Sequence, residues 1–97
     1  MDLTLTHQHV VITGGSKGIG LACAHAFLAE GARVTLLARN AQRLELAQSQ
    51  LAKAQGGQVK DGLIQVLSVD LTQAPLTLAA IDKVISQWGP IDVLVNS

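Results

Sequence analysis

The 97-residue sequence contains no tyrosine, one phenylalanine and one tryptophan, so aromatic residues make up only 2% of it. Its one cysteine, Cys23, cannot form a disulfide within the chain, which excludes a small disulfide-stabilised domain. Seven Lys and Arg balance seven Asp and Glu, and the lack of a basic excess argues against a nucleic-acid partner or a membrane-surface protein. No apolar run approaches the roughly 20 residues that cross a bilayer.

Aliphatic residues are abundant instead. Apolar residues make up 48% of the chain and charged residues 14%, a composition that builds a core and excludes intrinsic disorder. Residues 1–4 lack the basic region of a signal peptide, so we expect a cytoplasmic protein. Residues 91–97 read as a buried strand with nothing after it, so we interpret residues 1–97 as a fragment of a longer protein.

Four short apolar runs predict β-strands. They cover His9–Thr13, Arg33–Ala38, Leu63–Val69 and Ile91–Val95. Because each run is apolar at successive positions, we expect both faces of the sheet to be covered, as in a parallel sheet. The pattern therefore predicts an α/β fold: the N-terminal half of a Rossmann-type doubly wound parallel sheet, with strand order 3-2-1-4 and helices on both faces.

Helical spacing predicts a helix in each interval between the strands. The first runs over about residues 18–30, before a left-handed Gly31. The second follows the N-cap residue Asn40 and ends at residues 56–57, and the third is opened by Pro75 and stopped at Gly89. The expected inner faces are Ile19, Ala22, Cys23, Ala26 and Phe27 for the first helix and Leu78, Ile81, Ile85 and Trp88 for the third.

The most informative segment is the glycine-rich turn at residues 13–20, Thr-Gly-Gly-Ser-Lys-Gly-Ile-Gly. A phosphate that approaches such a turn needs bare backbone and outward-pointing amide groups, which glycines and a helix N-terminus supply. We assign Gly14 to the sharp turn, Gly18 to the close approach of a pyrophosphate and Gly20 to tight packing of the helix on the sheet. A plain glycine turn that binds nothing is the alternative.

The residues around this turn favour NADP over NAD. Ser16 and Lys17 add a hydroxyl and a positive charge to the turn. An NAD site favours an acidic residue at the end of the second strand, but this strand is followed by Arg39. A guanidinium there pairs well with a ribose 2′-phosphate, and we expect Lys17 to converge on the same phosphate.

The motif Thr13-Gly14-x-x-x-Gly18-x-Gly20 resembles the cofactor motif of the short-chain dehydrogenase/reductase family. Asp70, after the third strand, matches the position whose carboxylate meets the adenine amino group. Residues 89–96 look like the segment leading into the family's Asn-Asn-Ala-Gly motif, with Asn96 as its first Asn. The resemblance covers the chain from residue 9 onward, and it implies that residues 1–97 are the N-terminal part of a single NAD(P)-binding Rossmann domain, truncated before its catalytic half. It implies that the dinucleotide is bound by Gly14, Ser16, Lys17, Gly18, Ile19, Gly20, Arg39, Asp70, Leu71 and Asn96.

Within the family, residues 9–16, 37–40 and 68–71 look like the 3-ketodihydrosphingosine reductases, although general 3-oxoacyl reductases share several of these matches. The resemblance implies an NADP-dependent oxidoreductase that reduces a small-molecule ketone or lipid and forms a homo-oligomer at full length. For a eukaryotic protein, the subgroup implies the cytosolic face of the endoplasmic reticulum. An NAD-linked alcohol dehydrogenase and a non-catalytic dinucleotide-binding sensor are the alternatives.

The family's catalytic residues lie in a segment that this sequence does not contain. In the family a Tyr acts as the general acid and a Lys stands four residues later on a later helix, whereas this chain has no Tyr. We therefore assign no catalytic residue and expect these residues alone to be inactive. His7, His9 and His25 show no metal-ligand spacing, so no metal site is predicted. Asp70 and Asn96 also have plainer interpretations, as a helix cap and a strand-end turn residue.

Overall fold

The computed structural model describes residues 5–14, 16–54 and 63–97. Within these ranges strands and helices alternate along the chain. In order they are β1 (His9–Thr13), α1 (Gly18–Ala29), β2 (Arg33–Ala38), α2 (Ala41–Ala54), β3 (Ile64–Ser68), α3 (Ala74–Trp88) and β4 (Val93–Asn96). The strands form one parallel sheet in the order β3-β2-β1-β4. The predicted fold class and strand order are therefore confirmed.

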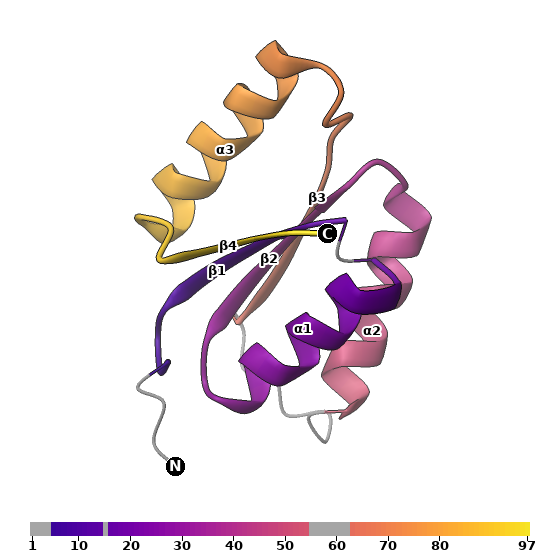
Figure 1. The fold of residues 1–97 in the computed structure, drawn as a ribbon, viewed down its shortest axis with the longest axis vertical. Coiled ribbons are helices and arrows are strands. Elements are labelled where there is room, and N and C mark those ends of the chain that lie inside the picture. The colour runs from indigo at the N-terminus through magenta and orange to yellow at the C-terminus, as the bar shows by residue number, and fades with distance from the viewer. Residues whose placement is uncertain (1–4, 15, 55–62) are drawn as a thin grey trace.

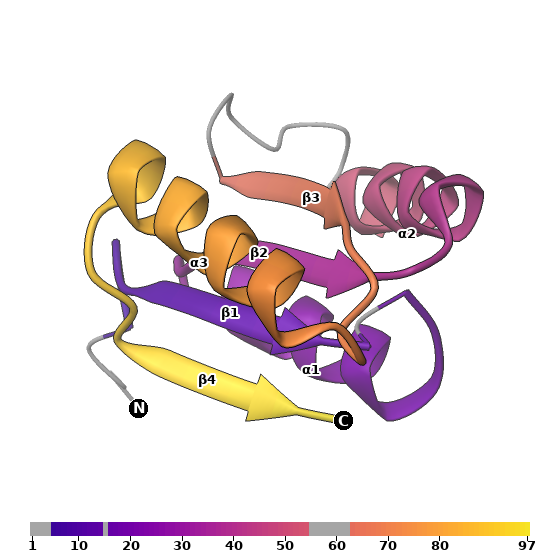
Figure 2. The same ribbon diagram turned by 90° about the horizontal axis from the view of Figure 1, so that it is seen from above.

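The helices lie on both faces of the sheet. α3 covers one face and α1 and α2 cover the other (Figure 1). Figure 2 shows that the strands all point the same way, so that their carboxyl ends share one end of the sheet. Every connection that follows a strand therefore begins at that end.

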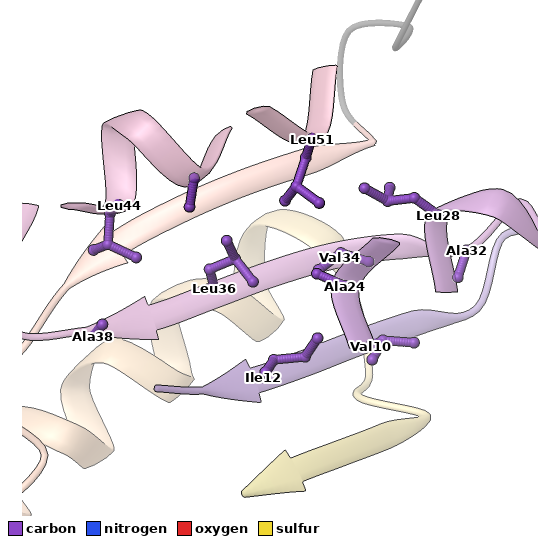
Figure 3. Packing of buried hydrophobic residues seen from close by; sticks show 11 residues of the cluster. Val10, Ile12, Ala24, Leu28, Ala32, Val34, Leu36, Ala38, Leu44 and Leu51 are labelled. Carbon is purple, nitrogen blue, oxygen red and sulfur yellow. The ribbon is translucent and has the colours of Figure 1, made fainter. Parts of the chain in front are cut away.

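Two hydrophobic cores hold these layers together. In the larger one, Val10 and Ile12 of β1 and Val34 and Leu36 of β2 point toward α1 and α2 (Figure 3). Its helical members are Ala24, Leu28, Leu44, Ala47 and Leu51. The smaller core lies against α3 and contains Val11, Leu37, Val69, Ala80 and Val84. Alternate residues of the central strands thus serve opposite faces, which explains their continuous apolar runs.

The buried faces of α1 and α3 differ from those expected. In α1 the buried residues are Gly20, Ala24 and Leu28, while Ile19 is 78% exposed. Ala22 and Ala26 are also exposed, and Cys23 and Phe27 are only partly buried. Because α1 is apolar around most of its circumference, helical spacing could not select the correct stripe.

A similar correction applies to α3. Its buried residues are Ala80 and Val84, whereas Leu78 is 64% exposed and Ile85 is also exposed. Ile81 and Trp88 are partly buried. The small side chain of Ala80 lets the helix approach the sheet closely, while Leu78 and Ile85 lie on the exposed side of the helix.

The ends of the elements follow the predicted signals within one or two residues. Asn40 caps α2, since its side-chain oxygen accepts a hydrogen bond from the Arg43 N–H at 2.9 Å. Gly31 and Gly89 have left-handed φ values of 86° and 85°, as suits the chain reversals after α1 and α3. The expected end of the second helix at residues 56–57 lies outside the described residues. None of the helices in the described part of the chain is long and apolar enough to cross a membrane.

We predict that the isolated 97-residue chain is marginally stable and self-associates through β4. β4 is an edge strand of the described sheet and its Leu94 is 62% exposed, and an unpaired apolar edge favours association. Leu94→Lys should therefore shift the mass measured by sedimentation toward the monomer. The matched control Leu46→Lys, at a 63% exposed position of α2, should leave the mass unchanged. A monomeric chain with a cooperative thermal melt at every concentration would contradict the prediction.

Candidate functional site

The carboxyl ends of β1 and β4 meet beside the glycine-rich turn. Thr13 pairs with Asn96 in the parallel register, and the Thr13 hydroxyl donates a hydrogen bond to Asn96 Oδ1 at 2.7 Å. The Ser97 hydroxyl donates to the Thr13 carbonyl oxygen at 2.9 Å. On the other side, the Gly14 N–H donates to the Leu37 carbonyl oxygen of β2 at 2.7 Å. The turn is thus tied to both strands that flank β1.

Gly14 and Gly18 both have left-handed backbone, in different surroundings. Gly14 has a φ of 71°, and a Cβ there would lie 2.8 Å from the Ser97 carbonyl oxygen, so no side chain fits between the turn and the residue after β4. Gly18 has a φ of 60°, and a Cβ there would meet no atom within 4 Å. Gly18 therefore presents bare backbone to open space, while Gly20 is buried against the sheet.

A cavity of about 670 Å³ opens on this turn. It is lined by Gly14, Lys17, Gly18, Ile19, Val95, Asn96 and Ser97. α1 begins here, and its N-cap residue Lys17 has extended backbone and makes no side-chain hydrogen bond to the helix end. The first N–H groups of α1 therefore remain available to an outside acceptor, and the helix dipole favours an anion there. These donors fit the pyrophosphate of a dinucleotide.

A second cavity, of about 490 Å³, lies where β2 and β3 end next to α3, and it brings Arg39 and Asp70 together. The rest of its lining is Leu67, Ser68, Val69, Leu76, Ala79, Ala80 and Lys83. The Ser68 hydroxyl donates to the Arg39 carbonyl oxygen at 2.8 Å, which holds the segment after β2 against β3. Lys17 and Arg39 line different cavities, so their convergence on one phosphate stays a prediction.

Asp70 follows β3 by two residues, and its carboxylate is held by Thr72. Asp70 Oδ1 accepts hydrogen bonds from the Thr72 hydroxyl at 2.6 Å and from the Thr72 N–H at 3.0 Å. The hydroxyl bond first, and the backbone bond second, lower the pKa of Asp70 below its usual 3.8, and the charge of Arg39 adds a smaller effect. Asp70 thus closes the turn before α3 and does not cap the helix, whose N-cap residue is Gln73, and it remains an ionised acceptor beside Arg39.

Of the remaining predicted residues, Ile19 and Asn96 line the first cavity, whereas Ser16 and Leu71 are not among its lining residues. Ile19 is exposed at its mouth and Ser16 is partly buried. Leu71 lines a groove of about 300 Å³ along α3 that also reaches Asn96, so Asn96 borders both spaces. Within residues 5–14, 16–54 and 63–97, no three His, Cys, Asp or Glu side chains gather as a metal site.

Two hydroxyl groups of the site, those of Thr13 and Ser97, received no role from the sequence. The Thr13 hydroxyl bonds to Asn96 and the Ser97 hydroxyl bonds to the Thr13 carbonyl oxygen. The predicted strand order already places the end of the fourth strand beside the first. The hydroxyl residues at these two strand ends could therefore have predicted, from the sequence, a polar contact between the ends of β1 and β4.

Comparisons with known proteins agree with this geometry. The sequence profile of the family described as short chain dehydrogenase matches residues 8–97. The 3-dehydrosphinganine reductase TSC10A of Arabidopsis thaliana is 41% identical over 95 residues, which cover 98% of this chain and 26% of that protein.

Solved structures give the same picture. L-sorbose reductase from Gluconobacter frateurii, complexed with NADPH and L-sorbose, aligns with a TM-score of 0.86 and 36% identity over 100% of this chain and 35% of its own. An NAD⁺-bound xylitol dehydrogenase aligns with a TM-score of 0.81 and 26% identity over 93% of this chain and 32% of its own. The chain thus spans about a quarter to a third of the length of these proteins.

Gly14→Ala is expected to destabilise the fold more than Gly18→Ala. Either substitution places a side chain on left-handed backbone, which costs about 1–2 kcal/mol. Only at Gly14 does the added Cβ collide with Ser97, and such overpacking adds about 1–3 kcal/mol. Urea denaturation measures both free energies of unfolding. Equal losses in the two variants would show that the contact with Ser97 does not constrain the turn.

The pKa of Asp70 predicts a pH dependence of stability. Because the pKa is lower in the folded state, the carboxylate stabilises the fold above pH of about 4, and this contribution is lost as the pH falls through the folded pKa. Thr72→Val removes the largest cause and should raise the pKa of Asp70 toward 3.8 in an NMR titration. Arg39→Ala should raise it less. A larger rise of the Asp70 pKa in Arg39→Ala than in Thr72→Val would show that the charge of Arg39, and not hydrogen bonding to Thr72, is the main cause of the lowered pKa.

Proposed function

This chain belongs to the short-chain dehydrogenase family, and from that premise we propose that its glycine turn binds the pyrophosphate of NADP in a protein that reduces a ketone. The observation that carries the proposal is the cavity at the start of α1, where uncapped helix amides and the bare backbone of Gly18 face open space. Anions bind such helix ends well. Lys17 adds a positive charge on the rim of the same cavity.

The adenosine end of the cofactor is assigned to the cavity that holds Arg39 and Asp70. Asp70 stays ionised and can accept a hydrogen bond from the adenine amino group, because the bonds from Thr72 occupy Oδ1 and not Oδ2. Arg39 can pair with a 2′-phosphate, since it lines the same cavity and its guanidinium fits a phosphate with two parallel hydrogen bonds. An acidic residue, which would select NAD, is absent from this strand end.

A bound nicotinamide cofactor supplies the hydride. The residues of this chain hold and orient the dinucleotide. The glycine turn binds its pyrophosphate, and Asn96 borders the cavity on the β4 side. No residue in this chain is assigned to protonate the substrate. We place that role in the part of the protein that corresponds to the remaining two thirds to three quarters, approximately, of the relatives' length.

For the substrate, we propose a long-chain 3-keto lipid of the 3-dehydrosphinganine type, another name for 3-ketodihydrosphingosine. The support is the identity of 41% with the 3-dehydrosphinganine reductase TSC10A across nearly the whole chain. For a eukaryotic enzyme with such a substrate we propose the cytosolic face of the endoplasmic reticulum as its location. We also propose that the full-length protein is a homo-oligomer. Turnover of a 3-keto sphingoid base by the protein that carries this chain, against a short 3-oxoacyl thioester as the competitor, tests the substrate class.

NAD is the alternative cofactor, favoured by the NAD⁺-bound xylitol dehydrogenase neighbour. Arg39→Asp should separate the two, because it removes the partner of the 2′-phosphate and supplies an acceptor for a 2′-hydroxyl. The affinity for NADPH, measured by calorimetry, should fall about 10-fold to 100-fold, as expected for a lost charged hydrogen bond, while NADH affinity stays or rises. Arg43→Asp, at an exposed position in α2, controls for the change in charge. An unchanged NADPH preference in Arg39→Asp would refute the role of Arg39.

A further inference from the structure

His9 is a fully buried polar residue that neither the fold nor the proposed cofactor site explains. It is the first residue of β1, with 0% of its surface exposed, and so lies at the end of the sheet opposite the glycine turn. Its ring lies 5.4 Å from that of Trp88, the last residue of α3, at an angle of 59°. Polar groups buried to this degree need complete hydrogen bonding, and His9 has it.

The hydrogen bonds of the ring define its tautomer. Nδ1 lies 3.2 Å from the Gly89 carbonyl oxygen, and Nε2 lies 2.9 Å from the Thr35 hydroxyl. A carbonyl oxygen only accepts, so Nδ1 carries a hydrogen, and in the neutral ring Nε2 then accepts from the Thr35 hydroxyl. This leaves the Thr35 oxygen to accept from Gln65 Nε2, at 2.8 Å. One directed chain of hydrogen bonds therefore runs from β3 through Thr35 and His9 to Gly89.

The backbone of His9 holds the same connection from its other end. The His9 N–H donates to Asp92 Oδ2 at 2.8 Å, and the Asp92 N–H donates to the His9 carbonyl oxygen at 2.9 Å. Arg33 adds a contact just before the connection from α3 to β4. Its guanidinium donates to the Trp88 carbonyl oxygen at 2.8 Å and lies over the Trp88 ring. The two ends of the connection from α3 to β4, Gly89 and Asp92, are thus both attached to His9.

This attachment matters because β4 specifies its own register weakly. The strand has four residues, of which Val93, Leu94 and Val95 are all apolar. A strand without polar and apolar alternation gains little from one register over another. A shift by one residue would move Asn96 away from Thr13 and take the site apart.

We propose that His9 is a positioning residue for the cofactor site: as the neutral Nδ1–H tautomer it fixes where β4 begins, and the register carries that position to Asn96 and Ser97. The ladder between β1 and β4 runs from the pair Val10 and Val93 to the pair Thr13 and Asn96, so the first pair determines the last. The consequence for cofactor affinity rests on the proposed function. The tautomer and the strand register do not.

The first test measures the ring directly. Nitrogen NMR of the chain labelled with ¹⁵N-histidine should find the His9 ring neutral, with hydrogen on Nδ1 and a coupling across the bond to Gly89. Free imidazole side chains favour the other tautomer, so hydrogen on Nε2 would overturn the proposal. This measurement requires no variant and no cofactor.

The second test uses variants that keep one nitrogen position each. The amide nitrogen of an Asn side chain can take the place of Nδ1 and still donate to the Gly89 carbonyl oxygen. The amide of a Gln side chain takes the place of Nε2, so the hydrogen bond to Gly89 is lost. His9→Gln should therefore shift the amide signals of Asn96 and Ser97 and weaken NADPH binding about tenfold, and His9→Asn should restore most of both. Thr35→Val is nearly isosteric and removes the donor to His9 Nε2. Its effect on the Asn96 and Ser97 signals and on NADPH binding should lie between those of His9→Asn and His9→Gln. This variant also keeps the test available if His9→Gln fails to fold.

Leu51→Ala is the matched control for a loss of stability. Leu51 is fully buried on the other face of the sheet, where α2 packs mainly against β2 and β3, so its truncation destabilises the fold without removing a contact of the His9 ring. Its NADPH affinity and Asn96 signals should match those of the unchanged chain. Equal effects in Leu51→Ala and His9→Gln, or none in His9→Gln, would overturn the proposal. If the unchanged chain binds no NADPH, the proposed function fails, and the Asn96 and Ser97 signals still decide the role of His9.

Discussion

The parallel pairing of β1 with β2 on one side and β4 on the other is the constraint on which the site depends. Parallel strands end at the same end of a sheet, so Gly14, Arg39 and Asn96 reach it from segments far apart in sequence. The backbone ladder also determines their relative heights. A dinucleotide is a long ligand, and only a row of strand ends offers it contacts along its whole length.

The glycine turn is closely packed on one side and open to solvent on the other. Toward β4 the turn is packed so closely that Gly14 has no room for a Cβ, and toward solvent Gly18 leaves an open space. A turn that was open on both sides would hold its amides less firmly, and one that was closed on both would admit no ligand. Tight support behind a bare surface is what a preorganised anion site requires.

The sequence predicted the strands and their order well, because buried parallel strands have a strong signal in their continuous apolar runs. It predicted the buried faces of α1 and α3 poorly. α1 carries Ile19 beside Gly20 and Ala24, and hydrophobicity alone favours the larger side chain although the sheet accepts the smaller ones. The glycine turn was found from its spacing, whereas the role of His9 depends on a partner 80 residues away, Gly89. No local pattern contains such a contact.

Overall charge and local charge also carry different information. Equal numbers of acidic and basic residues argue against a broad basic surface. Yet the linings of the two cavities contain Lys17, Arg39 and Lys83 against a single carboxylate, Asp70. That carboxylate is already bonded to Thr72, which leaves it as an acceptor at one oxygen. A phosphate-rich ligand at these cavities would therefore meet a net positive surface on a chain whose charges sum to zero. The nearest groups dominate the attraction at contact distance, because salt screens the more distant charges.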